Sequence, residues 1–431
     1  MDLGRFRYYF FYLLVFILPW QTRWIIRDPS WGGDIWEYSR ISLYGWDIVL
    51  IVLVLLCLPL LGQEWQKLKL NWRDPFFIYL LLLLYALIST LWAPDKLLTL
   101  VWILRLFEGG ILWFLAKALK PKLELVLLSL AAAGTIQALW SIGQFVTQTT
   151  FANKWLGVAI HPVSQGGTSV VLTQAGIWLR AYAGQVHPNV LGGLLVVSCL
   201  ATVYLIIKNY KFKIISFYWL LVLYVVQLTG LFFSFSRGAW LALAASLCLW
   251  WWHSRPNRRE LWPAFGWAAV VFVVLTVILW QPTAGRFFGH SRLEQQSVEE
   301  RVGSVGESRS LLSGSWWHGV GYGNYTVALE RLQPGLRSWR YQPVHNIFLL
   351  ALTELGVIGL GLFLWLLWII LSPLTTRSSP LVPVAGGYWL MAIIFTALFD
   401  HYWWTAPSMV LLFWLVIVSA SAGEQPPGQG S

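Results

Sequence analysis

Apolar runs long enough to cross a lipid bilayer recur along this sequence, and they constrain its fold more than any other feature. A transmembrane helix needs roughly 20 apolar residues, and twelve segments approach that length. They span about 6–22, 45–62, 75–92, 97–117, 123–146, 188–207, 214–233, 238–252, 262–280, 345–371, 381–399 and 406–420. Only 11% of the residues are charged, whereas a soluble protein carries roughly a quarter. We therefore predict an all-α, polytopic integral membrane protein with about 12 transmembrane helices, forming a single transmembrane domain over residues 1–420.

The short connections between these runs are basic, which predicts their side of the membrane. Lys67, Lys69 and Arg73 lie in one such connection, and Lys120 and Lys122 lie in another. The positive-inside rule assigns short basic loops to the cytoplasm. This topology accounts for the net charge of +11 and leaves no reason to expect a nucleic-acid partner.

Three longer connections, about 23–44, 147–187 and 281–344, fall on the opposite side. The largest, 281–344, is predicted to be an extracytoplasmic loop between helices 9 and 10. The tail over 421–431 is polar and rich in Pro and Gly, so we expect it to be disordered and cytoplasmic.

Polar motifs gather on the predicted outer side. They are RAYAGQVHPN (180–189), FSFSRGAW (233–240), PVHN (343–346) and FDHYWWT (399–405). The inner side carries only basic residues at the ends of the helices. This segregation favours a functional site that faces outward.

The residue types in these motifs suit a phosphate or diphosphate. Arg180, Arg237 and Arg309 are permanent cations that form bidentate bonds to phosphate. A helix opening at PVHN would also direct its N-terminus outward, where free N–H groups attract anions. His345 lies at that end. The natural anion at an outer membrane surface is the head group of a lipid carrier.

Simpler interpretations remain for the same residues. An arginine at a helix end often reaches toward lipid head groups, and His345 could act only as a helix cap. Asp400 and His401 could form an interfacial hydrogen-bonded pair. Arg105 and Glu108 are three residues apart and are expected to form a structural ion pair within the membrane. Glu354 must face either protein or a wet cavity.

Several chemistries lack their sequence signals. No cluster of Cys and His has zinc spacing, and no GxxxxGK[ST] motif is present. The outer acidic residues form no DxD pair to hold a divalent cation on a diphosphate. We therefore expect neither a cofactor nor a metal.

The motifs together resemble the O-antigen ligase and O-antigen polymerase superfamily. The resemblance rests on RAYAGQVHPNVLG, SFSRGAW, GVGYGNY, PVHNIFLLALTELGVIGL and DHYWWT, in that order. It covers roughly residues 75–420. It implies a membrane glycosyltransferase of the GT-C type in the bacterial cytoplasmic (inner) membrane, multi-pass, with its active site facing the periplasm or cell exterior. The implied donor is a glycan on undecaprenyl diphosphate, and the acceptor is a glycan or glycolipid.

The resemblance also implies roles for particular residues. Arg180 and Arg237 would bind the diphosphate, and His345 would be the base or would orient the acceptor. Further substrate-binding candidates are His187, Asn189, Asn346, Arg309 and His401. The implied reaction is metal-independent and inverts the anomeric centre.

Three alternatives stay open at this point. A polymerase of the same family would extend a lipid-linked glycan, whereas a ligase would attach it to its final acceptor. A polysaccharide or lipid transporter (flippase) would place polar residues near the middle of the bilayer, often in two related halves. A non-catalytic scaffold of an envelope complex would tolerate substitution of His345 and of both arginines.

Overall fold

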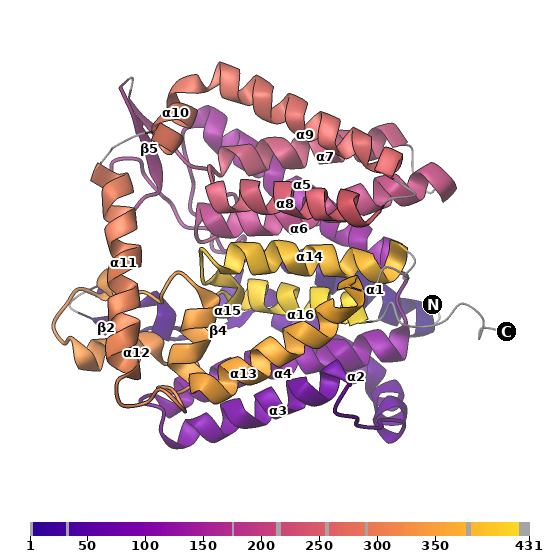
Figure 1. Cartoon of the computed structure of the whole chain (residues 1–431), viewed down its shortest axis with the longest axis vertical. Coiled ribbons are helices and arrows are strands. Elements are labelled where there is room, and N and C mark those ends of the chain that lie inside the picture. Colours follow the sequence, from indigo (N-terminus) through magenta and orange to yellow (C-terminus); the bar gives the residue numbers. More distant parts are fainter. Residues whose placement is uncertain are drawn as a thin grey trace.

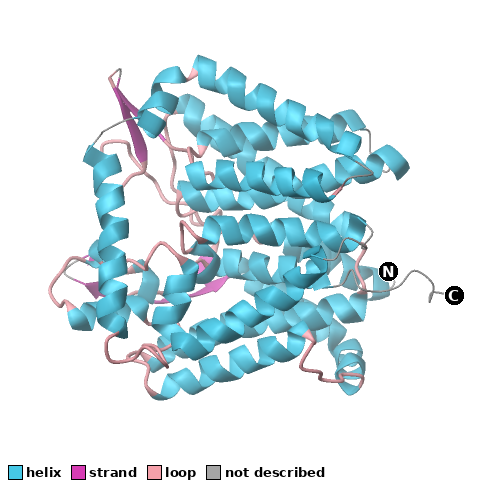
Figure 2. Ribbon diagram, in the orientation of Figure 1, coloured by secondary structure: helices cyan, strands magenta, loops and turns pink. Residues whose placement is uncertain are grey.

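The computed structural model describes residues 3–31, 34–174, 176–212, 217–254, 258–288, 292–375 and 381–421. Helices dominate the chain (Figure 2). The tail predicted over 421–431 lies outside the described residues except for Ser421.

A helix is present at each of the twelve predicted apolar segments. These helices are α1 (Leu3–Ile17), α2 (Gly45–Gln66), α3 (Pro75–Ile88), α4 (Lys96–Leu119), α5 (Leu123–Thr147), α6 (Pro188–Phe212), α7 (Phe217–Phe233), α8 (Arg237–His253), α9 (Arg258–Ile278), α13 (Ile347–Thr375), α14 (Leu381–Ala397) and α16 (Pro407–Ser421). Most of them lie side by side in one bundle (Figure 1). Among the described residues, six are long and apolar enough to cross a membrane, namely α2, α4, α5, α6, α9 and α13. A helical membrane protein is thus confirmed, while the number of twelve spans stays a prediction.

The connections are more structured than a purely helical class implies. The described residues there form three two-stranded antiparallel sheets: β1 (Arg23–Arg27) with β4 (Ile41–Tyr44), β2 (Ser30–Trp31) with β3 (Asp34–Ile35), and β5 (Val170–Thr173) with β6 (Gly176–Leu179). The backbone of these connections needs hydrogen-bond partners where it packs on the bundle, and short hairpins supply them. The predicted all-α class therefore holds, and these short strands are an addition to it within the connections.

The connection predicted over 281–344 is largely helical. It contains α10 (Trp280–Phe288), α11 (Arg292–Leu312), α12 (Tyr325–Leu332) and the 3-10 turn η4 (Ser338–Arg340). Other short elements of the described part of the chain are η1 (Glu37–Ser39), η2 (Ser89–Leu91) and α15 (Tyr402–Thr405). In Figure 1, α11 crosses one end of the bundle, and β2, β5 and α12 lie at that same end. The polar connections therefore form a cap over one end of the helices.

Helix α6 is the central element of the bundle. All of its apolar window is buried, and it packs against α5, α7, α8 and α14. A helix that is apolar all round belongs in such a core. The first turn of α6 carries Asn189, so a polar side chain sits at the capped end of the most enclosed helix.

Helix α13 is interrupted, and a loop fills the interruption. Gly356 has φ 66° and ψ −171°, a conformation that favours glycine. The Val320 N–H donates to the Thr353 carbonyl at 2.9 Å, and the Gly321 N–H donates to the Glu354 carbonyl at 2.8 Å. The loop thus satisfies backbone groups that the broken helix leaves open.

Glu354 fixes the same loop through its side chain. Its carboxylate accepts hydrogen bonds from the N–H groups of Gly323 at 3.0 Å and Tyr325 at 3.3 Å. It also accepts one from Nε1 of Trp404 at 2.8 Å. Glu354 is 2% exposed, so it faces protein, which is one of the two environments expected for it.

The expected Arg105–Glu108 ion pair is present and has a third member. Arg105 contacts Glu108 at 2.8 Å and also pairs with Asp47 at the start of α2. Its Nη2 donates to the Ser42 carbonyl at 3.0 Å. This cluster joins α4 to α2 and β4, which supports a structural role.

Candidate active site

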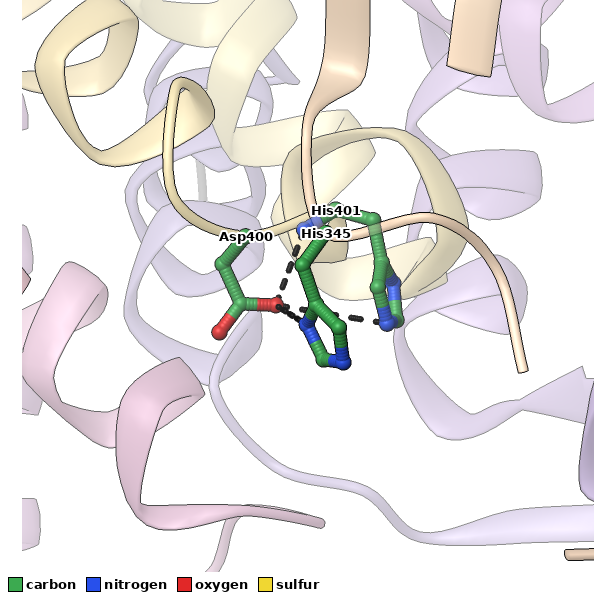
Figure 3. A group of neighbouring side chains, drawn as sticks. All are labelled: His345, Asp400 and His401. Atoms are coloured by element: carbon green, nitrogen blue, oxygen red, sulfur yellow. Dashed lines mark hydrogen bonds and ion pairs between the residues drawn. The ribbon is translucent and has the colours of Figure 1, made fainter. Parts of the chain in front are cut away.

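The carboxylate of Asp400 is the centre of a polar cluster at the capped end of the bundle. Asp400 lies between α14 and α15, and its Oδ1 accepts a hydrogen bond from the His401 backbone N–H at 2.8 Å. Nδ1 of His345 lies 3.5 Å from that oxygen, and Nε2 of His401 lies 4.0 Å from it (Figure 3). Two histidines from separate segments therefore face one carboxylate oxygen.

The His345 ring is held near this oxygen without a close hydrogen bond. A separation of 3.5 Å is long for a hydrogen bond, and Nδ1 of His345 is buried without a closer partner among the described residues. The rings of His345 and His401 are 5.1 Å apart between centroids. His401 is fixed from its other side, because its Nδ1 lies 2.6 Å from Oγ1 of Thr405.

The second oxygen of Asp400 connects to an arginine. Nδ2 of Asn189 donates to Oδ2 of Asp400 at 2.7 Å. Oδ1 of Asn189 in turn accepts from Nη2 of Arg180 at 2.7 Å, and Nε of Arg180 donates to the Ser234 carbonyl at 2.9 Å. Asn189 thus bridges the histidine side of the cluster to Arg180.

His187 holds the backbone of Asn189, the residue that forms this bridge. Its Nδ1 accepts a hydrogen bond from the Asn189 backbone N–H at 3.1 Å, which leaves the proton on Nε2. Nε2 lies 2.9 Å from Oγ of Ser169. His187 therefore positions Asn189 at the start of α6, and the substrate contact predicted for it stays a prediction.

Electrostatics keep Asp400 charged and two of the histidines neutral. Burial alone would raise the pKa of Asp400, but the contact with His345 and the positive charges that His345, His401 and His187 carry when protonated at low pH hold it well below its usual range. Burial lowers the pKa of His401 to about 4, although the charge of Asp400 opposes this. Burial, aided by the charge of Arg180, lowers the pKa of His187 to about 3. A fixed negative charge therefore lies next to neutral imidazoles.

Arg237 opens α8 close to the segment that holds Arg180. Its Nη1 donates to the carbonyl of Arg286 at 2.9 Å, and Nε of Arg286 donates to the carbonyl of Phe235 at 3.1 Å. Phe235 has φ 46°, which turns the chain sharply before α8. Arg180 and Arg286 both bond to carbonyls of this turn, so three cations are arranged around residues 234–237.

Asn346 has a structural role at the start of α13. Its Oδ1 accepts from the Leu349 N–H at 2.9 Å, and its Nδ2 donates to the Leu398 carbonyl at 3.1 Å. Asn346 is thus the N-cap of α13. The helix begins at Ile347, so the expected start at 345 is two residues early, and His345 precedes the cap.

The structure does not bring Arg309 into this cluster. Arg309 is exposed on α11, and among the described residues no hydrogen bond or ion pair joins it to the cluster. Asp400 was expected in an interfacial pair with His401 and was not among the predicted site residues. The signal was present, because Asp400 directly precedes His401 in a motif on the predicted outer side.

His345, Asp400 and His401 have the residue types that could hold a metal ion. One ligand atom from each lies within 4.8 Å of the others. Both oxygens of Asp400 already accept hydrogen bonds from protein, and the ligand atoms would have to move closer to reach bonding distances of about 2.1 Å. The arrangement suits a hydrogen-bonded histidine–carboxylate cluster as it stands.

The fold and this cluster define a multi-pass helical membrane protein with a histidine–carboxylate site under a polar cap. Residues 219–364 match the model of a family described as O-antigen ligase. The match runs from α7 into α13 and supports the O-antigen ligase and polymerase superfamily, which the motifs predicted. The family supports a membrane glycosyltransferase of surface polysaccharide biosynthesis. A comparison with curated proteins finds no match.

The matched segment contains part of the cluster. It includes Arg237, His345 and Asn346. Arg180, Asn189 and Asp400 lie outside it. The complete cluster therefore depends on how the folded chain places the matched segment against the rest of the bundle.

Proposed function

We propose that this protein transfers a glycan from an undecaprenyl-diphosphate carrier to an acceptor sugar at the outer face of the bacterial cytoplasmic membrane. The observation that carries the proposal is the convergence of His345 and His401 on Asp400, which Asn189 joins to Arg180. The cluster offers a base beside a buried carboxylate and a cation on its other side. In glycosyl transfer from a diphosphate, a base can accept the acceptor proton and a cation can stabilise the leaving group.

His345 acts as the general base in this proposal. With its proton on Nδ1 facing Asp400, the imidazole presents the lone pair of Nε2 to the acceptor hydroxyl. The ionised carboxylate stabilises the imidazolium that forms. The long 3.5 Å contact is of the kind that shortens when substrate binds.

The bond changes balance as a single displacement. The acceptor oxygen forms a bond to the anomeric carbon while the bond from that carbon to the diphosphate oxygen breaks. The acceptor proton moves to Nε2 of His345, and the diphosphate leaves with the electron pair. Attack opposite the leaving group inverts the anomeric centre.

Arg180 and Arg237 stabilise the negative charge that builds on the leaving diphosphate. Arg180 is 5% exposed, and Nε and Nη2 bond to protein, so it contributes mainly its charge. Arg237 is half-buried at the first position of α8 and is better placed for direct contact. With cations in this role, the proposed transfer needs no metal.

The outward orientation belongs to the same proposal. The cluster lies at the end of the bundle that the long connections cap, and the short basic connections are expected to face the cytoplasm. A lipid-linked donor in the outer leaflet would present its diphosphate to this end.

A deletion strain and a purified enzyme test the proposal together. Deletion should remove attached surface polymer if the protein is a ligase, and it should leave attached single repeats if the protein is a polymerase. Purified protein in liposomes should release undecaprenyl diphosphate from the glycan-linked donor only when acceptor is present. Movement of labelled donor across the liposome without bond formation would instead indicate a transporter.

A further inference from the structure

Tyr38, from the first long connection, lies against the histidine side of the cluster. Its ring meets the ring of His401 edge-on, with centroids 5.7 Å apart. Burial, followed by the charges of Asp400 and Glu37, raises the pKa of the Tyr38 hydroxyl, which is consistent with a place beside the carboxylate. Tyr38 is half-buried, and its hydroxyl has no hydrogen-bond partner among the described residues.

The residues that flank Tyr38 are tied to the protein. Glu37 forms an ion pair with Arg23 and a second with Arg40 at 2.7 Å. The carbonyl of Ser39 accepts from Nη2 of Arg27 at 3.0 Å. The backbone on both sides of Tyr38 is therefore fixed, while the phenol itself is left available.

A second set of contacts ties this connection to the segment that leads into His345. Trp36 is 5% exposed and packs against the buried ring of Tyr341, with centroids 6.0 Å apart. Oγ of Ser338 donates to the Ile35 carbonyl at 3.1 Å. The position of Tyr38 is thus set relative to His345 by packing, and it does not depend on a flexible loop.

The two oxygens of Asp400 divide the cluster into two sides. Oδ2 leads through Asn189 to Arg180, the side expected to hold the diphosphate. Oδ1 faces both histidines, and the ring of Tyr38 contacts one of them, His401. A ligand touching Tyr38 would therefore lie near the base and away from Arg180.

We propose that Tyr38 binds the acceptor sugar and positions its hydroxyl next to His345. This inference rests on the proposed function. A phenol offers an apolar ring that packs on sugar C–H groups and a hydroxyl that bonds to sugar oxygens. Pockets of this kind combine aromatic walls with a few placed polar groups. Because residues 23–44 lie outside the segment matched by the family, the first connection would supply acceptor recognition particular to this chain.

Kinetics with purified substrates test the inference. The probes are the acceptor glycolipid and the undecaprenyl-diphosphate-linked glycan, both purified from a deletion strain. For Tyr38→Ala we expect the KM for acceptor to rise about tenfold, with kcat and the KM for donor changed less than twofold. For Tyr38→Phe, which loses one hydrogen bond, we expect a rise of about threefold.

Two reference variants make the outcome interpretable. Trp24→Ala removes an exposed aromatic ring from the same connection and should keep wild-type kinetics. His345→Ala is measured in parallel, and its retention of transfer would refute the proposed function itself. If His345→Ala is inactive while Tyr38→Ala has a wild-type KM for acceptor, the inference about Tyr38 is wrong. If Tyr38→Ala is not recovered folded, Tyr38→Phe decides, and an unchanged KM for acceptor overturns the inference.

Discussion

Asn189 at the start of α6 donates a hydrogen bond to Asp400, 211 residues later in the chain, at 2.7 Å. This contact joins the most enclosed helix of the bundle to the turn between α14 and α15. It also joins Arg180 to the carboxylate that faces His345. The amide side chain of Asn189 therefore fixes the position of Arg180, the proposed diphosphate-binding cation, relative to the carboxylate beside His345, the proposed base.

Replacement of Asn189 by alanine should lower the transfer rate strongly without unfolding the protein. A hydrogen bond to a charged group contributes roughly 1.5–3 kcal/mol, so we expect kcat/KM to fall by roughly 10- to 100-fold. The measurement is in vitro transfer by purified variant. Asn71→Ala, at an exposed position of a short basic connection, is the matched control. A wild-type rate for Asn189→Ala would show that the bridge is not needed.

His345→Ala and Arg237→Ala should each abolish glycan transfer while the protein still inserts in the membrane. The His345 substitution removes the proposed base. The Arg237 substitution removes a cation that stabilises the negative charge on the leaving diphosphate. Transfer is measured in membranes, with protein amount checked by immunoblot. Arg292→Ala, an exposed arginine at the start of α11, should behave as wild type. Normal transfer by the His345 variant would rule out its catalytic role.

Glu354→Ala should destabilise the protein. It removes the acceptor for the N–H groups of Gly323 and Tyr325 and for Nε1 of Trp404. A buried donor left without a partner costs about 1–3 kcal/mol, so the loss of three acceptors should produce a large drop in Tm in detergent. Trp404→Phe removes the Nε1 donor itself, so no buried donor is left without an acceptor. The Tm of this variant should fall less than that of Glu354→Ala. Equal Tm values for the Glu354→Ala variant and wild type would contradict the role assigned to this carboxylate.

Stability should decrease on acidification because of His401. Its pKa is about 4 in the folded protein, whereas an unfolded histidine titrates near pH 6.5. Between about pH 6.5 and pH 4, His401 binds a proton in the unfolded chain but not in the folded protein. The free energy of unfolding therefore decreases as the pH is lowered through this range. The contribution is at most about 3 kcal/mol. Thermal unfolding at pH 7 and pH 4.5 should show a smaller pH effect in His401→Asn than in wild type. The same Tm decrease in both proteins would argue against this assignment.

Removal of divalent metals should leave transfer intact. In the proposed mechanism Arg180 and Arg237 supply the positive charge that a metal would otherwise supply, and both oxygens of Asp400 already accept hydrogen bonds from protein. Protein treated with EDTA and freed of chelator by gel filtration should retain its rate. If activity is lost and then restored by Mn²⁺ or Zn²⁺, the group His345, Asp400 and His401 holds a metal.

The helices could be predicted from sequence because each one is a local property of the chain. Length and apolarity suffice to identify a membrane helix, and a helix stands at each predicted segment. The local signal was weaker in the connections. Packing over the end of the bundle determines the strand pairs β1–β4 and β5–β6 and the helices α10, α11 and α12. Their hydropathy does not indicate this packing.

The candidate site was predicted in part for the same reason. His345, Arg180 and Asn189 lie in short motifs that can be recognised one at a time. Asp400 was overlooked because its importance comes from its contacts, which involve segments far apart in the chain. Tyr38 belongs to no motif, and tertiary contacts such as the packing of Trp36 on Tyr341 bring it to His401.

By itself, then, the sequence determined the bundle, the end at which polar residues gather and the identity of most candidate residues, because hydropathy and motifs are local. Only the tertiary structure decided which side chains meet. The PVHN segment is a candidate site because the fold places Asp400 next to His345, with Asn189 bonded to Asp400 and Tyr38 against His401. Such long-range contacts are set by the packing of the whole bundle, and no local pattern records them.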